Sequence, residues 1–322
     1  MKGLMKSFLK KLCINREEVI LAISEASKEN TYVENVMGSI ADSLHWNINK
    51  NYAETISIDF FRFARELIRK QRFGCVKLVA DITEENFYGK TSSLYIHGWT
   101  GEKGIVGKFR FLVVAALFRN QMIPFYISIL PVGAFKAEYL GKAIDYANSI
   151  GIKSSCLLLD RGFYSGDIID TLQMQKMSYL IFVPKKPVFK HMLESLENNY
   201  TIEYEIKYSK NKSTYKAETN IVLIKNYNEY DWVFASNIFL QDARKYVSLY
   251  KKRWNIETMF RVQDEAKIKT KSINPVIRMF YFTISMLLVL TWNLYHKTEI
   301  TFKGFVRENY KQLEENFRVS SF

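Results

Sequence analysis

The sequence has few of the residues that cross-link or interrupt a chain. Its 322 residues include three cysteines, Cys13, Cys75 and Cys156, and no CxxC pair. This pattern argues against a disulfide framework and is typical of a reducing compartment, so we expect a cytoplasmic protein. The four histidines are too scattered to predict a zinc site. Glycine and proline number only 14 and 5, which excludes a collagenous or low-complexity chain.

The overall composition is that of a well-packed globular protein with an excess of positive charge. Hydrophobic residues make up 48% and aromatic residues 15% of the chain. Lysine and arginine total 46 against 33 aspartate and glutamate, a formal net charge of +13. Such an excess predicts a polyanionic partner, either nucleic acid or an anionic membrane surface. A generally lysine-rich composition is the alternative explanation.

One apolar segment tests whether the chain spans a membrane. Met279–Tyr295 has 17 residues without a charge, at the lower limit of a membrane span. Thr283, Ser285, Thr291 and Asn293 dilute its hydrophobicity. We therefore predict a buried core helix and no membrane contact, with a transmembrane helix as the alternative.

The order of the predicted elements indicates a mixed sheet flanked by helices. Residues 1–70 have helical periodicity, clearest in Glu17–Ser27 and Ile56–Arg69. The segments that follow alternate between strand and helix patterns. Strands are predicted at 75–83, 108–118, 122–131, 155–160 and 179–184, and helices at 136–149 and 167–177. The first three strands resemble antiparallel neighbours and the later ones resemble crossover units.

The pattern changes after residue 184. Residues 202–208 alternate between apolar and polar side chains with a period of two, and further strands are predicted at 214–224 and 232–236. Residues 242–269 read as one long, charged helix. We divide the chain into a helical N-terminal region that is a candidate for DNA contact (1–70), a catalytic domain (71–184 and 231–300), a β-rich insertion (185–230) and a C-terminal tail (301–322).

Three carboxylates stand where chemistry is expected. Asp81 and Asp160 each end an apolar strand, and strand ends are where open α/β sheets place their sites. A capping or turn aspartate is the structural alternative for each. Tyr250, Arg253 and Glu257 are spaced to share one face of a helix, although an ordinary surface ion pair would also explain Arg253 and Glu257. Three carboxylates suit Mg²⁺ or Mn²⁺, and two such ions could catalyse phosphoryl transfer.

These residues resemble the motifs of a known family. Asp81-Ile82-Thr83, the segment Leu159–Phe163 (LDRGF) and the pattern Tyr250-x2-Arg253-x3-Glu257 are similar to the motif series of DDE transposases. The nearest group is that of bacterial and archaeal insertion sequences with a β-strand insertion before the last acid. The resemblance covers roughly residues 75–297 and implies an RNase H-like fold.

The resemblance also implies roles for single residues. Asp81, Asp160 and Glu257 would bind two Mg²⁺ or Mn²⁺ ions and catalyse cutting and joining of double-stranded DNA by a homodimer that holds the element ends and the target. Tyr250 and Arg253 would contact DNA, with Arg161 as a further candidate. The family usually has a basic residue seven positions after the glutamate, where this chain has Asp264. Arg261 or Lys267 would have to replace it.

Other interpretations stay open at this point. A metal-dependent nuclease of the same fold would cut DNA without joining it, and a derivative that has lost catalysis would only bind DNA. Trp232 and Trp254 could stack on bases or pack in the core. Lys103, Lys108 and Arg110, near several glycines, could contact phosphate or belong to a solvated hairpin connection.

Overall fold

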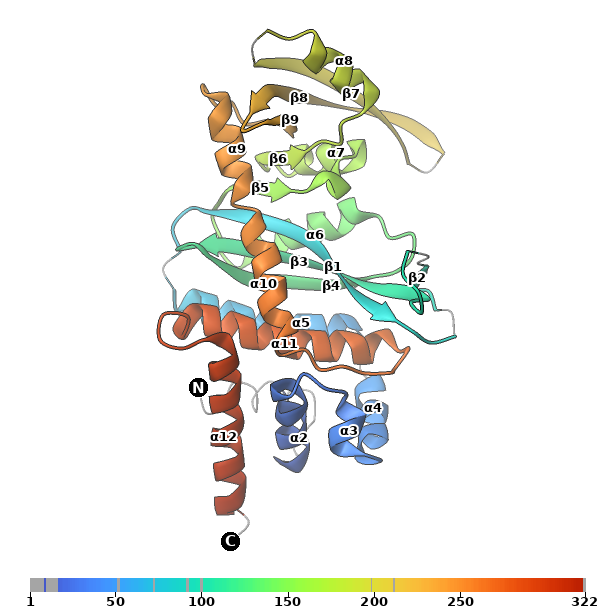
Figure 1. The fold of residues 1–322 in the computed structure, drawn as a ribbon, viewed down its shortest axis with the longest axis vertical. Helices are drawn as coiled ribbons and strands as arrows, with labels where there is room; N and C mark the ends of the chain where they lie inside the picture. The colour runs from blue at the N-terminus through green and yellow to red at the C-terminus, as the bar shows by residue number, and fades with distance from the viewer. Residues whose placement is uncertain are drawn as a thin grey trace.

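A single mixed β-sheet runs through the molecule (Figure 1). The structure is a computed structural model, and it describes residues 9, 17–50, 53–71, 73–90, 93–98, 101–197, 199–210 and 212–320. The strands that form the sheet are β1 (Val76–Phe87), β2 (His97–Gly98), β3 (Gly107–Phe118), β4 (Gln121–Leu130), β5 (Ser154–Leu159), β6 (Tyr179–Phe182), β7 (Tyr200–Lys210), β8 (Ser213–Tyr227) and β9 (Tyr230–Ser236).

The strand order is that of an RNase H-like fold with an extension. The sheet runs β2-β3-β1-β5-β6-β9-β8-β7, and β4 pairs with the part of β3 that follows its short pairing with β2. Strands β1, β3 and β4 are antiparallel neighbours, whereas β5 and β6 run parallel to β1. The fold class predicted from the sequence is therefore confirmed, including the change from antiparallel to parallel pairing.

The predicted hairpin between β3 and β4 is present and has a tight turn. Arg119 and Asn120 link the strands with φ angles of 47° and 65°. Two successive positive φ angles give the connection the twist that a two-residue hairpin needs. The turn brings the apolar segments 108–118 and 122–130 into antiparallel register, from Phe118↔Gln121 to Arg110↔Leu130.

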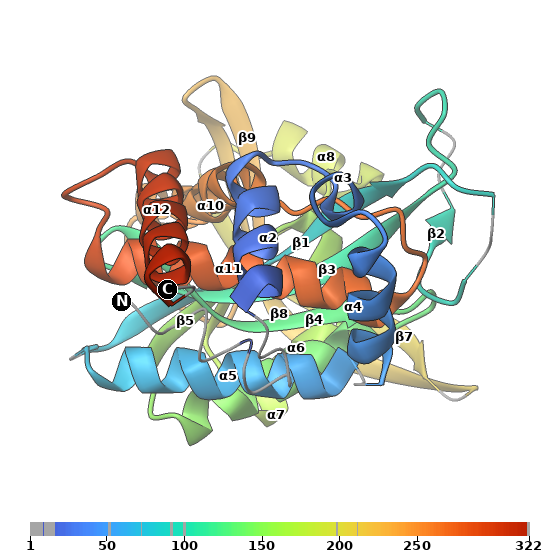
Figure 2. The same ribbon diagram turned by 90° about the horizontal axis from the view of Figure 1, so that it is seen from below.

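Helices lie on both faces and along one edge of this sheet. Their bounds are α2 (Glu17–Lys28), α3 (Val33–Met37), α4 (Ile40–Asn49), α5 (Ala53–Arg69), α6 (Lys136–Ser149), α7 (Gly166–Met174), α8 (Pro187–Glu194), α9 (Ala243–Lys251), α10 (Trp254–Asp264), α11 (Pro275–Tyr295) and α12 (Phe302–Ser320). In Figure 1, α9 and α10 cross the front of the sheet and α6 and α7 lie behind it. Figure 2 shows α5 and α11 side by side along the β3–β4 end.

The N-terminal region is helical in its described part, as predicted. Helices α2, α3 and α4 lie beyond α11, on the side away from the sheet, and α12 packs beside α2 (Figures 1 and 2). Residues 1–8, 10–16 and 51–52 of the predicted region lie outside the described residues. Helices α2, α3, α4 and α12 therefore form one helical layer next to α11.

The long helix predicted over 242–269 is wrong in its continuity. The structure has two helices, α9 and α10, joined at Lys252 and Arg253. At this junction the backbone bonds span three residues, from Arg253 N to Tyr250 O at 2.8 Å and from Ile256 N to Arg253 O at 2.9 Å. Such a tight turn changes the direction of the chain while keeping helical dihedral angles. Arg253 stands at this turn, directly before α10, and is buried.

The apolar segment 279–295 is part of α11, which is buried. This helix is long and apolar enough to cross a membrane, but 94% of its most apolar window lies inside the protein. Phe282 stacks on Phe111 of β3 with 4.2 Å between ring centroids, and the Asn293 amide donates to the Met122 carbonyl at 2.8 Å. This is the arrangement that the core-helix interpretation predicts.

The segment predicted as a β-rich insertion continues the central sheet. Strand β7 shows the predicted alternation of half-buried and exposed side chains along residues 202–208. Strand β9 pairs with β6 through Leu180↔Ser236 and Phe182↔Phe234, and β8 and β7 follow outward. The insertion is thus joined to the remaining strands by backbone hydrogen bonds. Its description as a separate domain stays a prediction.

The stacked pair Phe111–Phe282 provides a test of how α11 is held. Phe282→Ala leaves a cavity between α11 and the sheet, so we expect the free energy of unfolding to fall by about 3–5 kcal/mol in urea titrations. Phe239→Ala is the matched control, because that ring is 85% exposed, and we expect a change within about 0.5 kcal/mol. Equal effects of the two substitutions would contradict the packing described.

Candidate active site

Two of the predicted acids are brought together by the parallel pairing of β1 and β5. The register pairs Ala80 with Leu159, so the next step along both strands places Asp81 beside Asp160. Neighbouring strands lie about 4.8 Å apart, and residues at the same register position face the same side. Both acids line one cavity of about 330 Å³, together with His97, Arg110 and Lys136.

Asp160 is held by the turn that follows it. Its Oδ1 atom accepts a hydrogen bond from the Gly162 amide at 2.9 Å, which caps the short 3₁₀ turn Arg161–Phe163. A Cβ atom at position 162 would lie 3.1 Å from this oxygen, so glycine permits the close approach. Phe163, the last residue of the turn, is buried and packs in the core. The LDRGF segment therefore fixes the position of the Asp160 carboxylate.

The third acid joins the site through Arg253. The guanidinium donates from Nη1 to Asp81 Oδ2 at 2.8 Å, from Nη2 to Glu257 Oε1, and from Nε to the Tyr250 hydroxyl at 3.2 Å. Only 7% of the Arg253 side chain is exposed, against 15% for Asp81 and 56% for Glu257. Arg253 is therefore a buried counter-ion between an acid of β1 and an acid of α10.

The charges at the site influence one another. Burial raises the pKa of Asp81 to about 6; the Arg253 charge and the Ile82 amide oppose this shift, whereas the Asp160 and Glu257 charges add to it. Burial disfavours the charged form of Arg253, yet contact with Tyr250, Asp81 and Glu257 leaves the pKa of this guanidinium raised. The three acids thus form one electrostatic unit.

Tyr250 contributes its hydroxyl to the site and its ring to the core. The ring lies 5.3 Å from both Phe182 and Phe234 and 6.3 Å from Trp232, between centroids. Burial raises the pKa of the hydroxyl to about 12, so it stays protonated at neutral pH. Its hydroxyl oxygen accepts from Arg253 and orients the guanidinium toward the acids.

The carboxylate oxygens of Asp81, Asp160 and Glu257 are ligands that suit a hard divalent cation. In this structure the three carboxylates do not surround a common point. Among the described residues there is no group of three His, Cys, Asp or Glu side chains arranged to hold a metal ion. The Arg253 guanidinium lies between Asp81 and Glu257, which accounts for this. Asp81 and Asp160 are the pair that could begin a Mg²⁺ or Mn²⁺ site, because their oxygens are hard ligands and both side chains line the same cavity.

An aromatic cavity of about 620 Å³ adjoins the acids. It shares Asp160 and Arg253 with the site and includes Arg161 at its rim. Its aromatic lining consists of Phe182, Tyr230, Trp232, Tyr250 and Trp254. Trp232 is buried and packs on Phe234, whereas Trp254 is 47% exposed. Of the two tryptophans singled out in the sequence, Trp254 has the accessible ring.

The remaining predicted basic residues lie in different surroundings. Arg161 is exposed beside Asp160, and Arg261 is exposed on α10. Lys267 is 3.3 Å from Glu85 and 3.7 Å from Asp264, so it belongs to a separate ion-pair group near α11. That these residues and the buried pair Tyr250 and Arg253 contact DNA stays a prediction.

Two basic residues near glycines are part of a strand. Lys108 and Arg110 lie on β3 and pair with Glu84 of β1 at 3.0 Å and 2.8 Å. Although burial opposes it, hydrogen bonds from these two side chains lower the pKa of Glu84. They are neither in a hairpin connection nor in a phosphate-binding loop. Lys103 lies in the connection that precedes β3 and is exposed.

Lys136 is a site residue that the sequence analysis missed. Its ammonium donates to the Gly162 carbonyl at 2.7 Å and lines the cavity with both aspartates. Burial lowers the pKa of Lys136, and the nearby Asp160 charge opposes that shift. The one available signal was a lysine at the first position of a helix, where a basic residue opposes the helix dipole.

Part of this region is similar to a family of known proteins. Residues 139–280 match the family model described as "Transposase DDE domain". The match covers less than half of the chain and includes Asp160 and Glu257 but not Asp81. The comparison with curated proteins gave no match.

A solved structure shares the fold. It is described as a cryo-EM structure of the piggyBac transposase synaptic complex with hairpin DNA, with a TM-score of 0.56 and 13% sequence identity. The similarity covers 86% of this chain and 61% of that chain, so the present chain spans less than two thirds of its length. At this identity the similarity establishes the fold.

The raised pKa of Asp81 predicts how stability depends on pH. Because the folded protein holds this proton up to about pH 6 and an unfolded aspartate only to about 3.8, stability without metal should fall as pH rises from 4 to 7, by up to about 3 kcal/mol. Asp81→Asn cannot ionise and should remove this fall in urea titrations with a chelator present. Glu308→Gln, on the exposed side of α12, should retain it. The same pH dependence in Asp81→Asn and the unsubstituted protein would contradict the assignment.

Proposed function

We propose that this protein is a DDE transposase that cuts DNA at the ends of an insertion sequence and joins those ends to target DNA. The observation that carries the proposal is that Arg253 pairs with both Asp81 of β1 and Glu257 of α10, while Asp160 stands beside Asp81 after β5. The family match over residues 139–280 and the shared fold support it. We assign the protein to the insertion-sequence group with a β-strand insertion, acting as a cytoplasmic homodimer.

In this proposal the three carboxylates hold Mg²⁺ or Mn²⁺. Two bound ions would activate the attacking oxygen and stabilise the leaving oxygen of a phosphodiester. Water attacks first and releases a 3′-hydroxyl, which then attacks the target strand. Asp81 and Asp160 supply oxygens from adjacent strands, and Glu257 supplies one from the exposed side of α10.

The other residues of the site position the acids and the DNA. Tyr250 orients Arg253, and Arg253 holds Asp81 and Glu257 close together. Lys136, beside Asp160, provides positive charge toward which a phosphate would be drawn. The aromatic cavity with Trp254 provides a surface for a base next to the cut, because aromatic rings stack on bases of any sequence.

A nuclease without strand transfer is the second candidate, since the same acids would cut DNA in either case. Detection of joined products in a reaction with target plasmid supports the transposase, and cutting with no joined product supports the nuclease. The flanking genomic DNA offers an independent observation, because terminal inverted repeats and a short target duplication are expected around a mobile element.

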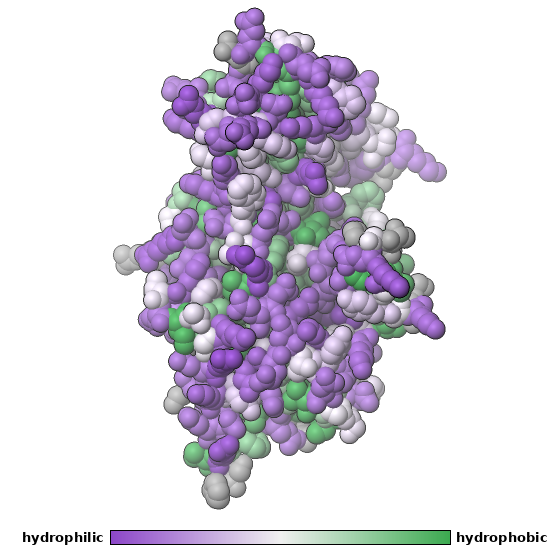
Figure 3. Space-filling model, viewed as in Figure 1, coloured by the Kyte–Doolittle hydropathy of each residue, from purple (hydrophilic) through white to green (hydrophobic). Residues whose placement is uncertain are grey.

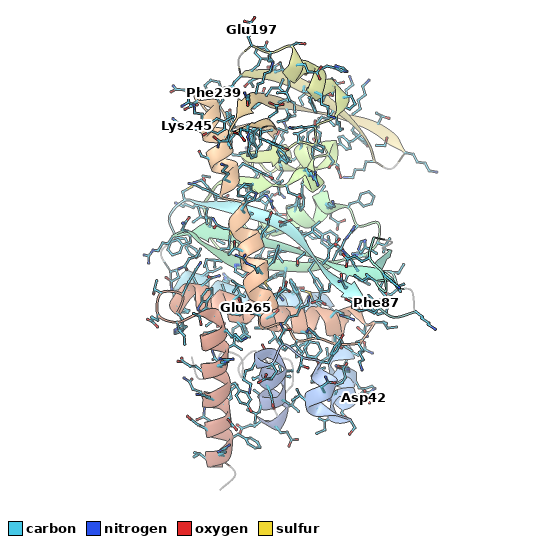
Figure 4. The ribbon with its side chains drawn as sticks, in the orientation of Figure 1. Asp42, Phe87, Glu197, Phe239, Lys245 and Glu265 are labelled. Carbon is cyan, nitrogen blue, oxygen red and sulfur yellow. The ribbon has the colours of Figure 1, made fainter. Side chains whose placement is uncertain are left out.

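Substitution of the acids tests the chemistry. Asp160→Asn and Glu257→Gln keep the shape of each side chain but remove a metal-binding charge, so Mg²⁺-dependent cutting of a duplex that carries the element ends should fall more than about 100-fold. Glu265→Gln, an exposed acid just after α10 (labelled in Figure 4), should cut like the unsubstituted protein. Cutting retained by either acid variant would refute the assignment.

Metal binding can be measured without any reaction. Saturating Mn²⁺ should raise the melting temperature by about 2 °C or more, because binding to the folded state alone stabilises it. The shift should disappear in the double variant Asp81→Asn/Asp160→Asn and persist in Glu265→Gln. An equal shift in all three proteins would show that Mn²⁺ binds elsewhere.

A further inference from the structure

An extended segment follows α10 and presents lysines at alternate positions. Lys267, Lys269 and Lys271 point to the accessible side, and Lys269 and Lys271 are exposed. The residue before each lysine is buried, namely Ala266, Ile268 and Thr270. This alternation is that of a β-strand, in which every second side chain faces the same way. The three lysines therefore form one row, which we call the lysine row.

The N-terminal helical region holds this row in place. The Lys269 amide donates to the Thr31 carbonyl, and the Val33 amide donates to the Lys269 carbonyl, both at 3.0 Å. The Ser27 hydroxyl donates to the Ala266 carbonyl at 2.9 Å, and the Asn30 amide to the Asp264 carbonyl at 2.7 Å. The connection between α2 and α3 thus pairs with the lysine segment and keeps it extended.

The lysine row lines a groove that neighbours the active-site cavity. The groove has a volume of about 830 Å³ and runs between the end of β1 and the segment after α10. In Figure 4 the labelled Phe87 and Glu265 mark these two elements, and Figure 3 shows a mainly hydrophilic surface below α10. Glu84 lines both this groove and the cavity of Asp81 and Asp160, so the two lie next to each other along β1.

The acidic side chains that line this groove each lie next to a basic one, and Asp264 is 3.7 Å from Lys267. Glu84 is paired with Lys108 and Arg110, as described above. Glu85 is buried and paired with Arg278 at 3.5 Å and Lys267 at 3.3 Å.

The other two lysines of the row are Lys269 and Lys271. Among the described residues, no acidic side chain lies within ion-pair distance of Lys269 or Lys271. Lys271 lies over the Tyr32 ring at 5.7 Å, and Tyr88 is 61% exposed at the opposite side. Two uncompensated ammonium groups and accessible aromatic rings are the features of a surface that follows a nucleic-acid backbone.

We infer that the lysine row and this groove bind the target DNA, and that the N-terminal helical region serves to present the row. The assignment to target DNA rests on the proposed function. Lysine binds phosphate as a point charge and reads no base sequence, whereas recognition of a fixed element end needs contacts to base edges. A groove that carries lysines and tyrosines and keeps its one arginine buried suits DNA of any sequence.

The salt dependence of DNA binding tests the groove without any catalysis. For a duplex of random sequence, the slope of log affinity against log salt should become less steep by about two in Lys269→Ala/Lys271→Ala, because two phosphate contacts are lost. Lys267 is left unchanged because it pairs with Glu85. Lys303→Ala/Lys311→Ala removes the same charge from exposed positions of α12 and should leave the slope unchanged.

The conservative pair Lys269→Arg/Lys271→Arg should keep the original slope. An unchanged slope in the alanine pair, or an equal change in the α12 control, overturns the proposed groove.

Cutting and joining assays test which DNA the groove holds. At about 0.15 M salt, Lys269→Ala/Lys271→Ala should cut element ends within about twofold of the unsubstituted protein but join precut ends to a plasmid about tenfold less. An equal loss of cutting and joining overturns the assignment to target DNA. If the unsubstituted protein neither cuts nor joins, the proposed function and this assignment fail together, and the salt slope still decides whether the groove binds DNA.

Discussion

The buried charge of Arg253 is the interaction on which the arrangement of the acids depends. Asp81 lies within the sheet and Glu257 on a helix that crosses it, and one guanidinium contacts both. Without that positive charge, a buried carboxylate on β1 would be destabilised by several kcal/mol or would take up a proton. The tight turn between α9 and α10 brings Arg253 to this position, and the Tyr250 hydroxyl orients it. The local geometry of one helix junction thereby determines how an acid of the sheet and an acid of a helix are related.

Much of the fold could be predicted because its signals are local. The alternation in residues 202–208, the apolar segments that end in Asp81 and Asp160, and the turn at Arg119 and Asn120 each reflect backbone geometry over a few residues. Both acids follow an apolar segment, as predicted, and the parallel register places them side by side. The prediction that Asp81 ends its strand is wrong, because β1 continues to Phe87 through pairing with β3. The fold class was predictable because these local signals indicate the order of strands and helices.

The features that sequence reasoning missed depend on contacts between distant segments. Lys136 contacts Gly162, which is 26 positions away in the sequence, and Glu85 contacts Arg278, which is 193 positions away. No local periodicity predicts either contact. The division of the charged helix at Lys252 was hidden because both halves have strong helical periodicity and the turn keeps helical dihedral angles. The burial of Arg253 was likewise invisible, since the same spacing of Arg and Glu describes an exposed ion pair.

The continuity of the sheet has a consequence for the distances that a bound molecule must span. Four strand-to-strand steps separate β5, which ends at Asp160, from β7 at the outer edge. At a spacing of about 4.8 Å, the outer edge lies about 19 Å from the acid. Backbone hydrogen bonds keep this interval constant, because each strand is paired with the next. The paired strands β6, β9, β8 and β7 therefore keep the β7 edge at a constant distance from Asp160. This distance can shorten only if hydrogen bonds between the strands break.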